Sequence, residues 1–174
     1  MAQVRRLCLH TPFAMTADPP VRLARPEDAA DIAAMSRDLI ERGLPWSWRP
    51  ARMLGAIRNP DTNVAVVRID GALVAFGIME YSEADAYLAL LAVRETRQRR
   101  GIGTALLRWL ESSARVAGAR RIRVEARRDN GPARTFYNEL GYHEIAIRRG
   151  RYSDGVDGVL LEKWLRASLD HGGD

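Results

Sequence analysis

Gln98-Arg-Arg-Gly-Ile-Gly-Thr104 separates two segments of different periodicity. The segment before it, Ala86 to Val93, is apolar on both faces, which is typical of a strand in the middle of a sheet. The segment after it places apolar side chains three and four residues apart from Ile102 to Ala117 and ends at Gly118. This spacing predicts an amphipathic helix. The sequence therefore predicts a buried strand, a glycine turn and a helix in succession.

The glycine turn is suited to bind an anion. Gly101 and Gly103 allow a tight turn that brings several backbone N–H groups toward one point, where the helix dipole adds positive potential. A P-loop would need Gly-Lys followed by Ser or Thr, and a Rossmann loop would need a third glycine at fixed spacing; the segment has neither. We expect the pyrophosphate of another ligand to bind here, with a simple capped helix as the alternative.

The rest of the sequence predicts an α/β domain with a mixed sheet. Proline and acidic residues open a helix from Pro26 to about Arg42, which Gly43 ends. Asp70-Gly71 between two apolar runs predicts a β-hairpin. The other expected elements are strands at 21–25, 64–69, 73–79, 121–127, about 142–149 and 156–165, and helices at 51–58 and from Asp129 or Asn130 to Gly141. The order is β-α-α-β-β-β-α-β-α-β-β, which packs helices on a sheet.

Length and composition indicate one globular domain. The 174 residues leave room for one ordinary core, and 47% hydrophobic with 28% charged residues is a typical globular balance. We expect the domain to span residues 21–166, with a flexible N-terminal extension at 1–20 and a flexible tail at 167–174. No apolar run is long enough to cross a bilayer, so we expect a cytoplasmic protein without a membrane segment.

Cysteine, histidine and lysine are scarce. Cys8 is the single cysteine, and His10, His143 and His171 have no metal-ligand spacing, so we expect neither a catalytic thiol nor a metal. The formal net charge is +5 and Lys163 is the only lysine, so almost all positive charge is guanidinium, which binds phosphates well. The codon bias of a GC-rich genome is the alternative explanation. The arginines are dispersed without an aromatic stacking motif, so no nucleic-acid partner is expected.

Two motifs in order carry a family resemblance. Val93 with Gln98 to Gly103, and Asn130 to Tyr142, are similar to the signatures Gln/Arg-x-x-Gly-x-Gly/Ala and Asn-x-x-Ala-x-x-x-Tyr-x-x-x-Gly-Phe of the GNAT superfamily of N-acetyltransferases, with Tyr142 in place of the usual Phe. The resemblance implies a central mixed, largely antiparallel sheet with helices on both faces and acetyl-CoA as co-substrate. It implies coenzyme contacts at Leu91, Ala92, Val93, Gln98, Arg99, Arg100, Gly101, Ile102, Gly103, Thr104, Asn130 and Tyr137.

Three further stretches, Val124 to Asn130, Arg148 to Tyr152 and Asp157-Gly158, resemble the ribosomal-protein-alanine N-acetyltransferases within that superfamily. Those enzymes carry the base five residues before the Asn, a position that Glu125 fills here. The resemblance implies that Glu125 is the base and Tyr137 the acid. The sequence departs from that group at Val156-Asp157-Gly158, where the group reads closer to Glu-Asp-Ala, and in the Trp46–Trp48 loop.

These assignments have alternatives. Glu125 could instead form an ion pair with Arg123 or Arg127, and Tyr137 could be a core aromatic. Some GNAT enzymes place the base on the central strand, where this sequence has Tyr87, which cannot be a base at neutral pH. The other acidic candidates and the two loop tryptophans, which either line a substrate mouth or only pack, are Glu80, Glu83, Asp85, Trp46 and Trp48.

The resemblance implies direct acetyl transfer to a primary amine in a ternary complex, without a metal, by a monomer or homodimer. A protein N-terminus is the expected acceptor, because the arginines near the matched region would repel a polyamine. These are Arg123, Arg127, Arg128, Arg148, Arg149 and Arg151. A small amine (an aminoglycoside, polyamine or amino acid) is the alternative acceptor, and a non-catalytic coenzyme A sensor is the alternative function.

Overall fold

The computed structural model describes residues 19–165. Within them the order of strands and helices is the predicted one. The strands are β1 (Val21–Leu23), β2 (Thr62–Ile69), β3 (Ala72–Ser82), β4 (Asp85–Val93), β5 (Arg121–Arg127), β6 (His143–Arg148) and β7 (Gly158–Trp164). The helices are α1 (Ala29–Leu39), α2 (Pro50–Arg58), α3 (Ile102–Val116) and α4 (Gly131–Glu139), with short 3-10 turns η1 (Pro26–Asp28) and η2 (Glu95–Arg97).

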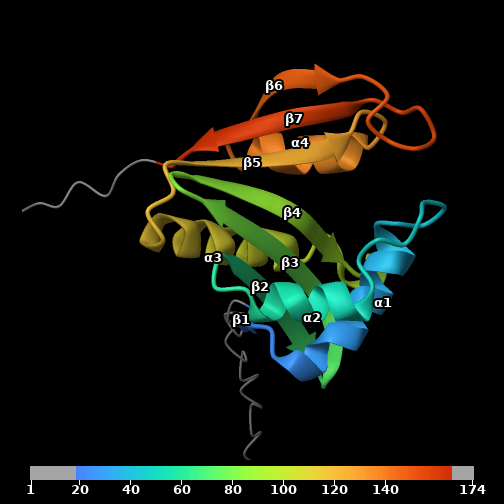
Figure 1. Ribbon diagram of the computed structural model, residues 1–174, viewed down its shortest axis with the longest axis vertical. Coiled ribbons are helices and arrows are strands. Elements are labelled where there is room, and N and C mark those ends of the chain that lie inside the picture. The colour runs from blue at the N-terminus through green and yellow to red at the C-terminus, as the bar shows by residue number, and fades with distance from the viewer. Residues whose placement is uncertain (1–18, 166–174) are drawn as a thin grey trace, which may run out of the picture.

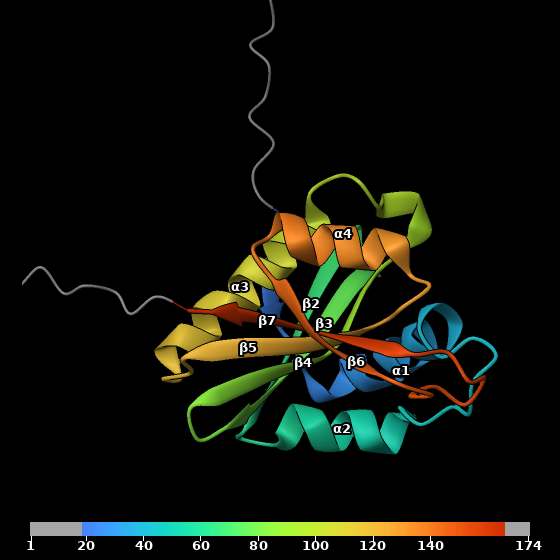
Figure 2. The same ribbon diagram turned by 90° about the horizontal axis from the view of Figure 1, so that it is seen from above.

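The strands form one sheet in the order β1-β2-β3-β4-β5-β7-β6. Every neighbouring pair is antiparallel except β4 and β5, which are parallel. Figure 2 shows α3 and α4 on one face of the sheet and α1 and α2 on the other. The predicted mixed, largely antiparallel sheet with helices on both faces is therefore confirmed.

The parallel strands β4 and β5 separate halfway along their length. Their pairing ends at Leu88 and Val124, and Figure 1 shows the two strands side by side at one end and diverging toward the other. At the same level β4 contains a bulge, because Leu88 and Leu90 pair with consecutive residues of β3 and Ala89 is extra. A bulge bends its strand and leaves one residue unpaired in the ladder. The sheet is thus opened next to its centre.

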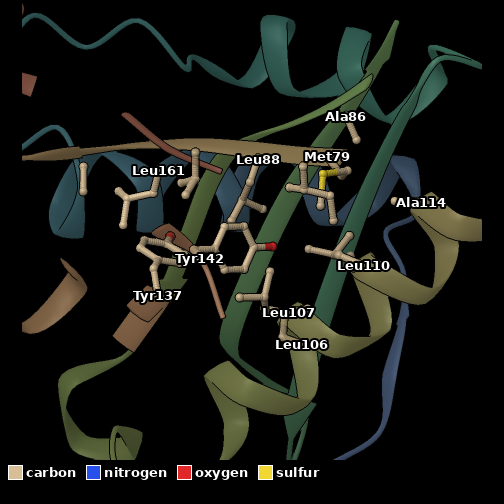
Figure 3. Packing of buried hydrophobic residues seen from close by; sticks show 14 of the residues in the cluster. Met79, Ala86, Leu88, Leu106, Leu107, Leu110, Ala114, Tyr137, Tyr142 and Leu161 are labelled. Atoms are coloured by element: carbon tan, nitrogen blue, oxygen red, sulfur yellow. The ribbon is translucent and has the colours of Figure 1, made fainter. Parts of the chain in front are cut away.

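Helix α3 anchors the core on its face of the sheet. Its buried side chains include Leu106, Leu107 and Leu110, each fully inaccessible, at the spacing that the sequence predicted. Figure 3 shows these leucines facing Leu88 of β4, with the ring of Tyr142 beside them. A helix buried along this stripe fixes the position of its N-terminal turn against the end of β4.

Helix α1 ends earlier than predicted, at Leu39 rather than near Arg42. The reason is Glu41, which is 8% exposed and accepts hydrogen bonds from the backbone N–H of Ser47 (2.7 Å) and of Trp48 (3.2 Å). These bonds turn the chain out of the helix and hold the loop to α2. Burial alone would raise the pKa of Glu41, but these hydrogen bonds lower it below its ordinary value.

Several predictions made from the sequence fall on residues outside the described part. These are the scattered Cys8, His10 and His171, residues 1–18 of the expected extension, and the expected tail at 167–174. Between residues 19 and 165 no helix combines the length and the apolar character of a membrane span. In the same range no three His, Cys, Asp or Glu side chains are grouped as metal ligands would be.

A buried carboxylate ties β1 and β2 to the start of α1. Asp28, 1% exposed, accepts hydrogen bonds from the Arg22 guanidinium (2.8 Å), the Arg25 backbone N–H (2.8 Å) and the Arg68 guanidinium (2.8 Å). Burial by itself would raise the pKa of Asp28, but these donors outweigh it and hold the pKa well below its usual range.

We predict that Asp28 makes the free energy of unfolding depend on pH in the acidic range. Because its pKa is lower in the folded state, its contribution is fully present above the unfolded pKa of about 3.9 and is lost as pH falls further. Asp28→Asn should lower the free energy of unfolding at pH 7 by about 3 kcal/mol, since both guanidinium groups lose a buried counter-ion and only Arg68 keeps another, Asp31. Urea titrations from pH 7 to pH 2 should show a flatter pH dependence in the variant. Parallel curves for both proteins would contradict this role.

Candidate active site

A groove of about 750 Å³ lies where β4 and β5 separate. Its floor is β4 from Tyr87 to Val93 and β5 from Val124 to Arg127. The loop after α1 forms one wall, including Glu41 and Trp48. Residues of α4 and of the loop after β6 close the other side: Asn130, Ala133, Tyr137, Arg151, Tyr152 and Ser153. The groove therefore exposes an unpaired strand edge to a wall that carries both charged and phenolic side chains.

Glu125 lies in this groove with only 8% of its side chain exposed. It belongs to the face of β5 that points away from α3, because Ile122, Val124 and Ala126 are buried on the α3 side, as the alternation predicted. Its carboxylate is held by two guanidinium groups. Arg151 Nε donates to Oε1 at 2.7 Å, and Arg148 Nε lies 3.3 Å from Oε2.

The ion-pair partners that the sequence suggested for Glu125 are wrong. Arg123 Nε instead donates to Glu162 (2.8 Å), and Arg127 binds Asp129 (3.1 Å) and Asp154 (2.7 Å). Both guanidinium groups therefore pair with carboxylates on neighbouring strands and loops. Glu125 pairs instead with Arg148, the last residue of β6, and with Arg151 in the loop after it.

Three tyrosines surround Glu125 in the groove. Tyr137 comes from α4 and is 7% exposed, while Tyr87 and Tyr152 come from β4 and the loop after β6. Burial raises the pKa of Tyr137 above its ordinary value, and the neighbouring Tyr152 and Tyr87 add to the rise. Burial, followed by the charge of Glu125, likewise raises the pKa of Tyr87 and Tyr152. All three phenols keep their protons at neutral pH, so each can donate one.

The glycine turn lies next to the end of β4. Gly101 is the N-cap of α3 with φ of 78°, a left-handed conformation that favours glycine, and no side chain caps the helix there. A Cβ placed on Gly103 would meet Val93 Cγ2 at 3.4 Å and the Phe136 ring at 3.5 Å. The first turn of α3 therefore packs closely between β4 and α4, with its backbone N–H groups directed away from the helix.

The structure brings half of the predicted coenzyme contacts together in this groove. Gln98 lines the groove and its amide Nε2 donates to the carbonyl of Val93 (3.0 Å), so it links the turn to β4. Asn130 also lines it and caps α4, with its side chain accepting from the Ala133 N–H (3.1 Å). The side chain of Ile102 is buried in the core, which leaves only its backbone for a ligand. The groove lining includes Leu91, Ala92, Val93, Gln98, Asn130 and Tyr137, but not Arg99, Arg100, Gly101, Ile102, Gly103 or Thr104.

The alternative acids lie outside the groove. Asp85 accepts hydrogen bonds from Nε and one terminal nitrogen of Arg121 (2.8 Å each), and these bonds hold the pKa of Asp85 below its ordinary value. Glu80 lies opposite Tyr87 in the β3–β4 ladder, and neither it nor Glu83 lines the groove. Of the two tryptophans, Trp48 lines the groove and is buried, whereas Trp46 packs against the core next to α1 and α2.

Sequence reasoning missed what Arg148, Arg151 and Gly158 do. The two arginines were part of a recognised stretch, but only their charge was interpreted. A Cβ on Gly158 would come within 3.1 Å of the Glu125 carboxyl carbon and 3.2 Å of Arg151 Cγ. The only signal for this contact was the departure at Val156-Asp157-Gly158, where glycine stands in place of alanine.

Comparison with protein families matches residues 31–142 to the acetyltransferase (GNAT) family. An N-alpha-acetyltransferase of Sulfurisphaera tokodaii is 27% identical over 155 residues, covering 81% of this chain and 90% of that protein. The ribosomal protein bS18 alanine N-acetyltransferase of Escherichia coli is 33% identical over 94 residues, covering 53% of this chain and 64% of that protein. The chain thus spans just under two thirds of the bacterial relative.

Among solved structures, Ard1 from Thermoplasma volcanium is similar with a TM-score of 0.75 at 25% identity. The match covers 86% of this chain and 99% of that one. Its extent includes both the sheet that opens between β4 and β5 and the helices on either face.

Proposed function

The chain belongs to the acetyltransferase (GNAT) family, and we propose that it transfers the acetyl group of acetyl-CoA directly to the N-terminal amine of a protein. The observation that carries this proposal is the groove between β4 and β5, which holds a buried carboxylate, Glu125, and a buried phenol, Tyr137, beside an unpaired strand edge. A coenzyme sensor without catalysis would not need that pair.

The β4 end of the groove and the turn of α3 next to it fit the coenzyme. The uncapped first turn of α3 presents backbone N–H groups and the positive end of a helix dipole, which suit a pyrophosphate. The β4 edge from Leu91 to Val93, past the last pair with β5, offers backbone groups to the pantetheine amides in the manner of an added strand. Gln98 joins these two parts through its bond to Val93.

Bound acetyl-CoA supplies the acetyl thioester, and the chain's residues move the protons. Glu125 takes the proton of the acceptor ammonium, directly or through water, so that a neutral amine can form the new C–N bond. Backbone N–H groups of β4 stabilise the negative charge that develops on the carbonyl oxygen. As the C–S bond breaks, the Tyr137 hydroxyl gives its proton to the departing sulfur. A phenol that burial keeps protonated suits this role.

The relatives and the charge of the groove both support a protein N-terminus as acceptor. The archaeal relative is named an N-alpha-acetyltransferase and the bacterial one acts on a ribosomal protein's alanine. Arg148 and Arg151 both contact Glu125, and their positive charge would disfavour a polycation at that point. The test is thiol release from acetyl-CoA with short Ala- or Ser-initiated peptides, compared with spermidine and an aminoglycoside. Faster turnover of the peptides is expected; background rates with peptides and efficient acetylation of a small amine would establish the alternative acceptor.

We predict that Gly103→Val weakens acetyl-CoA binding by roughly tenfold or more. The valine methyl groups extend beyond a Cβ that already contacts Val93 and Phe136, so the first turn of α3 must move and its N–H groups lose their alignment. Calorimetry measures the affinity. Gly55→Val in α2 is the control, because a Cβ there meets nothing within 4 Å. Unchanged affinity in a folded Gly103→Val protein would falsify this placement of the coenzyme.

A further inference from the structure

More positive charge than negative charge surrounds the catalytic carboxylate. Arg148 and Arg151 both hold Glu125, and both are more than half exposed, at 55% and 56% of their side chains. Arg151 donates to Glu125 through its Nε, and Nε is also the nitrogen of Arg148 that lies closest to the carboxylate. Two guanidinium groups therefore share one carboxylate at the mouth of the groove, and their outer N–H groups contact no other carboxylate among residues 19–165.

The neighbouring Arg123, Arg127 and Arg128 do not carry surplus positive charge. Arg127 is bound by Asp129 and Asp154, Arg128 by Asp157, and Arg123 by Glu162. Because each of these has a carboxylate of its own, the surplus charge that contacts Glu125 is that of Arg148 and Arg151. Arg149 between them forms no ion pair among residues 19–165, but it does not contact Glu125. A planar guanidinium with free N–H groups binds a carboxylate in bidentate fashion.

The ion pair of Glu125 and Arg151 packs closely against the backbone of β7. Glu125 and Arg151 lie against Gly158 of β7, where a Cβ would approach the carboxyl group and the arginine stem to 3.1 and 3.2 Å. Such distances are shorter than side chains tolerate without moving. Gly158 therefore leaves room for Arg151 to reach the carboxylate of Glu125.

We propose that the acceptor carries a carboxylate close to its amine, as an acidic side chain at the second or third residue of a protein N-terminus. This inference rests on the proposed function and names its substrate class. The acceptor's carboxylate binds the outer N–H groups of Arg148 and Arg151. Their hold on Glu125 weakens, and Glu125 becomes free to take the ammonium proton.

The same arrangement explains how an ammonium group can approach this site. A cation that enters the groove meets the surplus charge of two guanidinium groups before it reaches Glu125, and like charges at an interface disfavour binding. A carboxylate one or two residues away cancels that surplus. An acceptor with a neutral or basic second residue lacks this compensation.

The test compares two matched peptides, Ala-Asp and Ala-Asn at the first two positions with the same following sequence. With the wild-type enzyme we expect kcat/KM to be roughly tenfold higher for the Asp peptide, and the difference to shrink with added salt. A third peptide has Asn at the second position and Asp at the seventh, so it has the same net charge. It should behave like the Asn peptide, which separates local contact from long-range attraction.

Protein variants assign the preference to residues. Arg148→Gln should reduce the Asp-over-Asn ratio to about twofold. The control is Arg149→Gln, because Arg149 is the adjacent exposed residue and does not contact Glu125, so the ratio should stay as in the wild type. A ratio that survives both Arg148→Gln and Arg151→Gln overturns the inference.

Two results separate this inference from the proposed function. Equal rates for the Asp and Asn peptides overturn the inference and leave the proposed function intact. Failure to acetylate any peptide overturns the proposed function, and the inference with it. Free alanine and alaninamide form a second pair of acceptors. If only free alanine is preferred over its amide, the recognised carboxylate is that of an amino acid and not of a peptide side chain. That result also overturns the inference.

Discussion

Replacing Glu125 with glutamine is expected to lower turnover by roughly 10²–10⁴-fold while acetyl-CoA still binds. Glutamine keeps the shape of the side chain but cannot accept the ammonium proton. The two other carboxylates that line the groove, Glu41 and Glu95, come from the loop after α1 and from η2 and not from β5. The acidic limb of the pH–rate profile should disappear in the variant, because the group that must be deprotonated is gone. Single-turnover thiol release measures the step directly.

The matched control for this prediction is Glu80→Gln. Glu80 lies across the β3–β4 ladder from Tyr87 but does not line the groove, so its loss should leave the rate and the pH profile as they are. If Glu125→Gln turns over at the parental rate with the parental pH dependence while Glu80→Gln is slow, the base is on β3. Tyr137→Phe tests the acid in the same assay and should also slow release of the thiol.

Replacing Lys163 with methionine is expected to lower the free energy of unfolding by about 3 kcal/mol or more. Glu111 of α3 is 3% exposed and accepts hydrogen bonds from Lys163 Nζ of β7 (2.8 Å to each oxygen) and from the Tyr142 hydroxyl (3.1 Å). Loss of the only lysine leaves a buried carboxylate without a counter-ion. Urea denaturation at pH 7 measures the change.

Two further variants separate the charge from the packing. Glu111→Leu combined with Lys163→Met should recover most of the loss, because no buried charge remains unpaired. The exposed pair Arg37–Asp38 is the control, and Asp38→Asn should leave the urea midpoint close to the wild-type value. Similar losses from Lys163→Met and Asp38→Asn would contradict the role given to the buried pair.

Tyr142 couples this buried group to the site. It stands where the family signature has Phe, and its ring lies edge-on to Tyr137 at 5.6 Å between centroids. Figure 3 shows it between Tyr137 and the leucines of α3. The extra hydroxyl therefore gives the buried Glu111 a hydrogen bond while the ring supports the proposed acid.

The elements of the fold were predictable because their signals are local. The alternation of β5, the hairpin at Asp70-Gly71 and the apolar stripe of α3 depend only on neighbouring residues, and the structure has all three. The end of α1 was not predictable. It depends on Glu41, whose partners Ser47 and Trp48 are six and seven residues away in a loop.

The candidate site was predictable only in part, for the same reason. Glu125, Tyr137 and Gln98 belong to motifs, and the structure brings them to one groove. The arginines that hold Glu125 are more than 20 residues along the chain, Arg148 at the end of β6 and Arg151 in the loop after it. Gly158 contacts Glu125 only because β7 lies beside β5. No local pattern encodes a contact that depends on strand order.

Mass spectrometry of the product tests the central claim most directly. A peptide with an N-terminal alanine, an aspartate at the second position and an internal lysine is incubated with isotope-labelled acetyl-CoA and the wild-type enzyme. The account predicts one labelled acetyl group on the α-amine, and none on the same peptide with a blocked N-terminus. Label on the lysine side chain, or no label on either peptide while a small amine is acetylated, would contradict it.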